Sequence, residues 1–394
     1  MPRALACLIA ALLAIARPRH GSDAARADTP VRSAGHESRD AHPATLITVQ
    51  CANRSNCTRE IQTALDADGV QSVTISDGGS GHPIVVEPLF IRASDRVITL
   101  LPGVELLAMP GAFQGLKDSL VTVVNCSNVT LLANGATLRM RKHDYLPPRY
   151  TKGEWRMTLQ IRASRWVTVV GGRYVDAGGD GIYIDGGAGV HNPPSNIVLD
   201  GVYCDGAWRN GLSVISAVNL TVKNSVFTRT NGTNPQCGID LEPDSGADRL
   251  QGIVFENVTI NRNSKCGFAM SLYALVNASQ PVDVTIDSMN ITDVPGTAYS
   301  WGSPPTRWVG GYGLQLASSF NLTGTFRARK LQVSQTFAAA LYVVNWPTGT
   351  IPLSFDRLTI SNCTAGTRQP EVRVQKGFQY FSVSAQLIQP LALN

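Results

Sequence analysis

The stretch Gly181-Ile182-Tyr183-Ile184-Asp185 opens with a small residue, alternates apolar and polar side chains, and returns along the chain. The first residues of its successive copies are Gly181, Gly211, Gly238, Gly267, Gly313 and Ala340. These numbers give steps of 30, 27, 29, 46 and 27 residues. Self-similarity at such a period indicates a repeat architecture, so the sequence predicts a solenoid.

A second type of strand follows the first, as in Asn196-Ile197-Val198-Leu199 and Asn219-Leu220-Thr221-Val222. Turns rich in Gly, Asn and Asp separate these strands, and no amphipathic helical stretch of about ten residues does, which disfavours βαβ units. We therefore expect an all-β, single-stranded parallel β-helix whose rungs stack at roughly 4.8 Å. The long step between Gly267 and Gly313 predicts an inserted loop near Pro295 to Trp308. The stacked core row is expected to contain Ile182, Leu212, Ile239, Phe268 and Leu314.

The N-terminus begins with a short basic segment and an apolar run from Ala4 to Ala16, which is too short to span a bilayer and typical of a secretory signal. We expect cleavage after Ala16 or Ala27. The helix predicted over Arg59 to Ala67, with Thr58 as N-cap, belongs to a cap at the N-terminal end of the solenoid. The expected organisation is a signal peptide and leader over 1–27, a disordered linker over 28–44 and a β-helix domain over 45–394.

The charge of the chain is modest, with 16% charged residues, a net charge of +5 and a pI of about 8.8. Lysines and arginines are scattered and form no long run, so we expect no nucleic-acid partner. A mildly basic surface fits either a solvated exterior or attraction of an acidic polysaccharide. No segment reaches membrane-spanning length, so no membrane span is expected.

Cysteine use indicates an oxidising compartment. Of the eight cysteines, Cys7 lies in the predicted signal, and the remaining odd number leaves at least one thiol free or paired between chains. Cys237 and Cys266 each precede a repeat glycine, and a rung spacing of about 4.8 Å suits a disulfide. Cys51 and Cys57 form the other expected pair. Together with many Asn-x-Ser/Thr sequons, these features predict a secreted, extracellular glycoprotein.

Several stretches carry a family resemblance. Ile61 to Asp66, Leu101 to Leu106, Gly153 to Arg156, Gly178 to Tyr183 and Gly238 to Asp244 resemble the pectate-lyase-like superfamily of right-handed β-helices, over roughly residues 45 to 390. That superfamily includes polygalacturonases, pectate lyases and alginate epimerases. The resemblance implies a right-handed fold and a carbohydrate-active protein with a polysaccharide or oligosaccharide substrate. The Asn-Thr-Asp, Asp-Asp, Gly-His-Gly and Arg-Ile-Lys motifs of polygalacturonases are absent, so the resemblance implies activity only as a class.

The candidate chemistry centres on Asp240 and Glu242. With Ile239 and Leu241 inside, the two carboxylates should point outward together, with Cα atoms about 6.6 Å apart. One carboxyl can hold a proton while the other stays ionised, which suits acid–base work on a sugar. The predicted catalytic residues are Asp240, Glu242, Asp180 and Arg209. The predicted substrate-binding residues are Tyr183, Asp185, Asn210, Ser213, Asp244 and Tyr273.

Three classes of function fit these residues. The first is a glycosidase that uses Asp240 and Glu242. The second is a polysaccharide lyase or epimerase with Arg209, His191 or Tyr183 as base and a carboxylate or Ca²⁺ as charge neutraliser. The third is a non-catalytic carbohydrate-binding or surface protein, in which the carboxylates are ordinary surface groups. We expect no cofactor unless the protein is a lyase that uses Ca²⁺, and no metal ligands are assigned.

Overall fold

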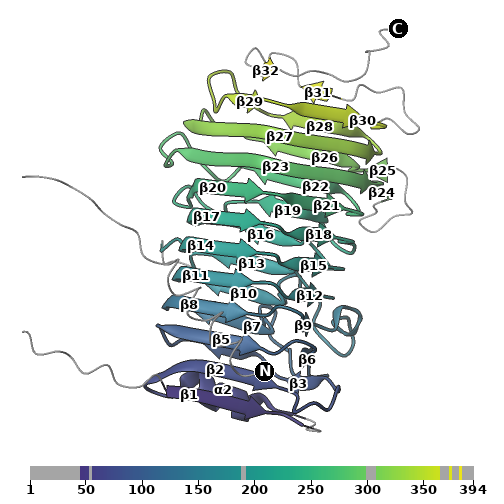
Figure 1. Ribbon diagram of the computed structural model, residues 1–394. Coiled ribbons are helices and arrows are strands. Elements are labelled where there is room, and N and C mark those ends of the chain that lie inside the picture. The colour runs from purple at the N-terminus through teal and green to yellow at the C-terminus, as the bar shows by residue number, and fades with distance from the viewer. Residues whose placement is uncertain are drawn as a thin grey trace, which may run out of the picture. The chain divides into compact units, whose positions relative to one another are not determined.

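Short parallel strands stack along the whole length of the repeat region, as Figure 1 shows. This computed structural model describes residues 45–52, 56–187, 192–298, 308–363, 372–374 and 381–383. The predicted signal peptide, leader and linker lie outside the described residues. About every 30 residues the chain completes one rung and returns to pair with the rung before it. The described chain is therefore a parallel β-helix, as the repeat predicted.

Ten strands form one face of the solenoid and carry the repeat copies. In chain order they are β4 (Leu89–Ile91), β7 (Val121–Val124), β10 (Leu159–Arg162), β13 (Ile182–Asp185), β16 (Leu212–Val214), β19 (Cys237–Leu241), β22 (Cys266–Ser271), β26 (Tyr312–Ala317), β28 (Ala339–Val344) and β31 (Val372–Val374). The predicted register is confirmed, because Leu212 pairs with Ile182 and Ile239, and Phe268 pairs with Ile239 and Leu314.

Two further ladders form the rest of each rung and merge in the long strands β23 (Val282–Val294) and β27 (Gly324–Thr336). The first ladder contains β1 (Thr45–Gln50), β2 (Val70–Ser76), β5 (Arg96–Leu100), β8 (Ser127–Leu132), β11 (Arg165–Val170), β14 (Ser195–Asp200), β17 (Ala217–Lys223), β20 (Leu250–Glu256), β29 (Leu353–Phe355) and β32 (Phe381–Val383). The second contains β3 (Ile84–Val86), β6 (Glu105–Ala108), β9 (Thr137–Arg139), β12 (Arg173–Val175), β15 (Tyr203–Asp205), β18 (Val226–Thr228), β21 (Val258–Asn261) and β30 (Leu358–Ser361).

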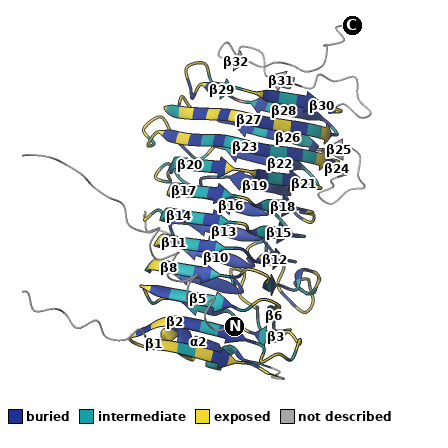
Figure 2. Cartoon of the chain, in the orientation of Figure 1, coloured by how far each residue is buried: buried dark blue, intermediate teal, exposed yellow. Residues whose placement is uncertain are grey.

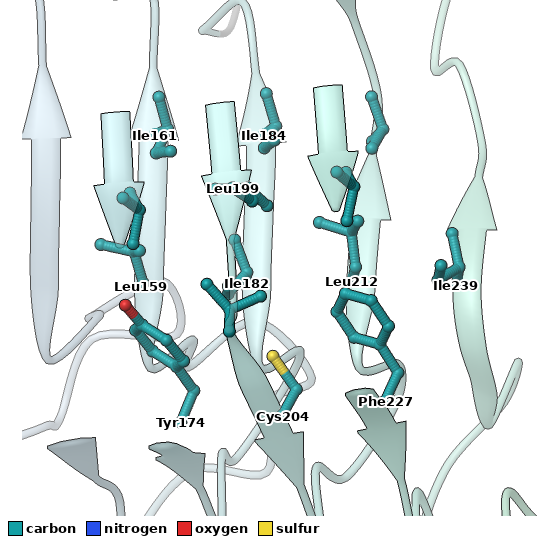
Figure 3. Packing of buried hydrophobic residues seen from close by; sticks show 14 of the residues in the cluster. Leu159, Ile161, Tyr174, Ile182, Ile184, Leu199, Cys204, Leu212, Phe227 and Ile239 are labelled. Carbon is teal, nitrogen blue, oxygen red and sulfur yellow. The ribbon is translucent and has the colours of Figure 1, made fainter. Parts of the chain in front are cut away.

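The core fills the space between the three ladders. Figure 3 shows how Ile182 and Leu212 of the ten-strand face meet side chains from the second ladder, such as Tyr174, Cys204 and Phe227. All of these residues are at most 1% exposed. No rung could bury this apolar row alone, so the stacking of rungs is what stabilises each of them.

The repeat glycine has a steric cause. A Cβ atom built on Gly211 would lie 2.6 Å from the carbonyl oxygen of Gly238 in the next rung, and one on Gly238 would lie 2.9 Å from that of Gly267. Real Cβ atoms do not approach backbone oxygen so closely, so at these two positions only glycine lets the loop enter the strand beside its neighbour. This close approach also brings the residues just ahead of each glycine near one another on successive rungs.

The N-terminal rungs carry the one α-helix of the described residues, α2 (Thr58–Asp66), which packs on β1, β2 and β4. The predicted N-cap is wrong by one residue, because the cap position is Cys57. The Thr58 hydroxyl is already engaged, since it donates to Asn56 Oδ1 and accepts from the Glu87 N–H. A 3₁₀ turn, η1 (Lys142–Asp144), lies in the long connection between β9 and β10.

The predicted insertion and disulfides are present. The antiparallel pair β24 (Thr297–Ala298) and β25 (Trp308–Val309) flanks residues outside the described ranges, at the place where the repeat lengthens. Disulfides join Cys51 to Cys57 and Cys237 to Cys266, the latter between strands that pair in register. Among the described residues, no helix has the length and apolarity needed to cross a bilayer.

Candidate functional site

The candidate site lies on the outer face of the ten-strand sheet. Tyr183 of β13 pairs in register with Ser213 of β16, which pairs with Asp240 of β19. Ile239, the residue before Asp240, belongs to the core. Because side chains alternate along a strand, Asp240 and Glu242 are directed away from the core, as the sequence predicted.

One arginine joins the loops that enter these strands. Arg209 Nη1 lies 3.8 Å from Asp180 Oδ2, and Nη2 lies 3.5 Å from Glu242 Oε2. Its Nε lies 4.0 Å from Glu154 Oε2 and donates to the Asn234 carbonyl at 3.1 Å. Only 12% of the Arg209 side chain is exposed. A largely buried guanidinium therefore connects three carboxylates that come from three different rungs.

Asp240 is far less accessible than the sequence suggested. It is 1% exposed, and all five residues of β19 are buried, whereas 39% of the Glu242 side chain is exposed (Figure 2). The loop ahead of β16 covers Asp240, and Asn210 Nδ2 donates to its Oδ2 at 3.4 Å. This corrects the expectation of two solvent-facing carboxylates, because Glu242 alone of the pair reaches solvent.

The two carboxyls of this pair titrate as a unit. Burial raises the pKa of Asp240 well above its ordinary value, the charge of Glu242 raises it further, and Arg209 opposes both effects. Burial also raises the pKa of Glu242, although Arg209 and a hydrogen bond with Asp240 act to lower it. Both carboxyls therefore resist ionisation, and the buried Asp240 does so more strongly than the partly exposed Glu242.

Asp180 lies behind Arg209 and is fully buried. Burial raises its pKa from 3.8 to about 6, against the lowering effect of Arg209. The Asn210 backbone N–H donates to its Oδ1 at 2.8 Å. The carboxyl has no exposed surface in this structure, and its predicted catalytic role stays a prediction. It orients Arg209 and balances its charge.

Asn210 and Ser213 were predicted to bind substrate, but they are 0% and 2% exposed. Asn210 Nδ2 donates to Ser213 Oγ at 3.0 Å, and Asn210 Oδ1 accepts from the Cys237 N–H at 2.9 Å. A hydrogen bond from Ser213 also lowers the pKa of Asp180, although burial outweighs it. In this structure both side chains form hydrogen bonds within the cluster, and their predicted role in substrate binding stays a prediction.

Tyr183 and Asp185 border the cluster on the preceding rung. Burial raises the pKa of Tyr183, and the charges of Asp244 and Asp185 add to this effect. Asp185 is 8% exposed and engaged, because Gln160 Nε2 donates to its Oδ2 at 2.6 Å and Arg162 Nε to its Oδ1 at 3.3 Å. Tyr183 is half-buried beside the site, whereas Asp185 offers little free hydrogen-bonding capacity.

Asp244 and Tyr273 have different outcomes. Asp244 is exposed two residues beyond Glu242, and its pKa is raised by partial desolvation and by Asp248, while Arg209 opposes. Tyr273 is 45% exposed in the turn after β22. No hydrogen bond or ion pair within the described part of the chain links Tyr273 to the cluster, so its place in the site stays a prediction.

Sequence reasoning gave no role to Glu154 and Lys265. Glu154 Oε1 accepts from the Thr233 hydroxyl at 3.1 Å. Burial lowers the pKa of Lys265, against the charges of Asp240 and Glu242. Lys265 stands two residues before its repeat glycine, as Arg209 does, so the repeat alignment contained a signal for it. Glu154 carried no such signal, because it comes from the irregular connection before β10.

The cluster already contains its own cation. Within the described residues, no group of three or more His, Cys, Asp and Glu side chains is arranged to hold a metal ion. Arg209 instead occupies the position between Asp180, Glu242 and Glu154. His191, named as an alternative base, lies outside the described residues.

Comparisons with known proteins support the fold. No protein-family model and no curated protein matches the sequence. Among solved structures, a polygalacturonase from Erwinia carotovora ssp. carotovora is 14% identical, with a TM-score of 0.54 over 90% of this chain and 100% of that one. PfbA, a surface adhesin of Streptococcus pneumoniae, is 13% identical, with a TM-score of 0.52 over 80% and 76% of the two chains.

A Family 28 exopolygalacturonase of Yersinia enterocolitica is also similar, at 13% identity and a TM-score of 0.51, over 84% of this chain and 68% of that one. Two of these three neighbours are named as enzymes and one as an adhesin, so they agree on architecture and differ in activity. Together with the parallel ladders, these likenesses show that the chain has the fold of a right-handed parallel β-helix.

Proposed function

We propose that this protein cleaves glycosidic bonds in a polysaccharide, with Glu242 as the carboxyl that meets the substrate. The observation that carries the proposal is the coupled pair of Asp240 and Glu242, in which one member is buried and the other exposed. Carboxyl groups with raised pKa values in a polar cluster are what general acid catalysis near neutral pH requires. An ordinary surface carboxylate has neither a buried partner nor a shared proton.

The proposed chemistry moves one proton at a time. The pair holds a proton, and Glu242 delivers it to the glycosidic oxygen as the bond to the anomeric carbon breaks. Water then adds to that carbon and gives a proton to a second carboxylate. Asp244 suits this role, because it is exposed and lies within electrostatic reach of Tyr183 and Arg209. Arg209 stabilises the negative charge that remains on Glu242.

The lyase alternative receives less support from the electrostatics. A lyase base must accept a proton, but the raised pKa of Tyr183 keeps its phenol protonated. Burial acts to lower the pKa of Arg209, but Asp180, Glu242 and Asp240 outweigh it and raise the pKa, so the guanidinium stays charged. A lyase with Ca²⁺ and a base elsewhere remains the second candidate. Its unsaturated product would separate it from a hydrolase.

The test is a panel of polysaccharides assayed for new reducing ends and for ultraviolet-absorbing unsaturated ends. For a hydrolase we expect reducing ends without the absorbance. Glu242→Gln should lower turnover by about a hundredfold or more, since it removes the titrating group and preserves the shape. The matched control is Glu256→Gln, an exposed glutamate on β20 of another face, which should keep wild-type turnover.

Wild-type turnover by Glu242→Gln on an identified substrate would refute the assignment of Glu242. Ultraviolet-absorbing products from every active substrate would favour the lyase. Binding without any product would favour the third class, a carbohydrate-binding protein. We also propose that the protein acts outside the cell, which its two disulfides support.

A further inference from the structure

Asn210 forms several hydrogen bonds in the cluster, and it joins three successive rungs. Its backbone N–H donates to Asp180 Oδ1 at 2.8 Å in the rung before, and its Oδ1 accepts from the Cys237 N–H at 2.9 Å in the rung after. Its Nδ2 donates to Ser213 Oγ at 3.0 Å and to Asp240 Oδ2 at 3.4 Å. The side chain is fully buried, so no water competes for these bonds.

The orientation of the Asn210 amide follows from its partners. A backbone N–H can only donate, so the atom that faces the Cys237 N–H must be the amide oxygen. The amide nitrogen therefore faces Ser213 and Asp240. The nitrogen has two hydrogens, and these two acceptors use both of them.

This orientation constrains the proton of Asp240. An oxygen that accepts a hydrogen bond from an amide cannot point its own proton along the same line, so Oδ2 acts as the carbonyl oxygen of the acid. The proton then belongs on Oδ1, which is buried and has no donor of its own within the described residues. Glu242 is the neighbouring carboxylate, and its charge raises the pKa of Asp240.

We propose that Asn210 is a positioning residue that holds Asp240 Oδ2 as a hydrogen-bond acceptor and so places the proton of a neutral Asp240 on Oδ1. The inference rests on the proposed function for its catalytic meaning, although the placement of the proton itself does not depend on a substrate. Asn210 never touches the substrate. It acts through Asp240, which hands the proton to the exposed member of the pair.

The charged groups around the pair do not supply this direction. Arg209 contacts the carboxylates of both Glu242 and Asp180. Lys265 and Asp244 influence Glu242 only through their charges. These groups set how readily the pair ionises, whereas the fixed amide of Asn210 decides which oxygen of Asp240 holds the proton.

Infrared spectroscopy of the full chain reads the placement directly. A protonated carboxyl has a carbonyl stretch that shifts to lower frequency when its carbonyl oxygen accepts a hydrogen bond. At neutral pH we expect one such band in the wild type that Asp240→Asn removes. Asn210→Leu deletes the donor to Oδ2, so this band should move to higher frequency.

The matched control is Asn263→Leu. Asn263 is also fully buried, and its Oδ1 accepts a hydrogen bond from the Thr230 N–H at 3.1 Å. Replacing Asn263 with leucine therefore removes a comparable buried hydrogen bond at a place outside the acid pair. The Asp240 band should not move in this variant. If Asn210→Leu does not fold, Asn210→Asp keeps the acceptor for the Cys237 N–H, lacks the donor and should also shift the band.

A second readout applies once a substrate is known. In both Asn210 variants the alkaline limb of the pH–rate profile should move up by about one unit, because the ionised form of Asp240 loses a hydrogen bond. Lack of an Asp240 band in the wild type, or an unmoved band in a folded Asn210 variant, would overturn the inference. Failure to cleave any polysaccharide would overturn the proposed function and leave the band shift intact.

Discussion

Removing the Cys237–Cys266 disulfide should destabilise the protein more than removing Cys51–Cys57. The two bridges form a matched pair, because all four cysteines are at most 3% exposed and both bridges join residues within the solenoid. They differ in the length of chain they enclose, with sequence separations of 29 and 6 residues. The comparison of the two double Cys→Ala variants therefore isolates the effect of loop length.

The magnitude follows from loop-closure entropy in the unfolded chain. For a loop of 29 residues the constraint is worth about 3.6 kcal/mol at 25 °C, and for one of 6 residues about 2.2 kcal/mol. The lost packing of the sulfur atoms is similar in both variants and largely cancels in the difference. Cys237→Ala/Cys266→Ala should thus be less stable than Cys51→Ala/Cys57→Ala by about 1.4 kcal/mol.

Equilibrium unfolding in urea measures this difference, with both variants and the wild type compared under the same non-reducing conditions. The dependence of unfolding free energy on urea must agree among the proteins, because a changed slope would report an altered unfolded state or loss of two-state behaviour. An equal cost, or a larger cost for the Cys51–Cys57 variant at an unchanged slope, would refute the entropic reasoning.

Three further predictions concern stability. Gly211→Ala should cost about 1–3 kcal/mol of unfolding free energy in urea melts, because the new Cβ would meet the Gly238 carbonyl; unchanged stability would contradict this. Burial raises the pKa of Asp180 from 3.8 to about 6, so the folded state binds the extra proton and stability falls as pH rises through this window. In Asp180→Asn, the loss of unfolding free energy between about pH 4 and pH 7 should be smaller by up to about 3 kcal/mol. An unaltered dependence of stability on pH would exclude the effect. Arg209→Gln should lower the free energy of unfolding by about 3–5 kcal/mol at pH 7, because it leaves buried carboxylates without their cation. The loss should be smaller below about pH 5, where Asp180 is protonated. An equal loss at both pH values would argue against the ion pair.

The fold was predictable because its signal repeats. Ile182, Leu212 and Ile239 occupy equivalent places in copies about 30 residues apart, so each copy supports the assignment of the others. The pairing of Cys237 with Cys266 followed from the same alignment. The N-cap at Thr58 was misplaced because the hydroxyl bonds to Asn56 and Glu87, and Glu87 is distant in sequence.

The site was predictable only in part. Alternation along β19 fixed the side on which Asp240 lies, but not its burial, which depends on how the loop ahead of β16 folds over the sheet. The same loop buries Asn210, which looked like a surface residue in the sequence. Irregular loops have no periodicity from which their course could be inferred, so the contact of Glu154 with Arg209 had no sequence signal either.

The distribution of the cluster over separate rungs has a consequence for how this protein can change by duplication or loss of a repeat. Asp180, Asn210 and Asp240 come from three consecutive copies, and their contacts cross from each copy to the next. Gaining a whole copy between β16 and β19 would leave every ladder paired and the core continuous. It would also move Asp240 about 4.8 Å further from Asn210, beyond hydrogen-bonding distance. The scaffold can therefore lengthen by whole repeats at either end without damage to the site, whereas the three central repeats must be inherited as a block.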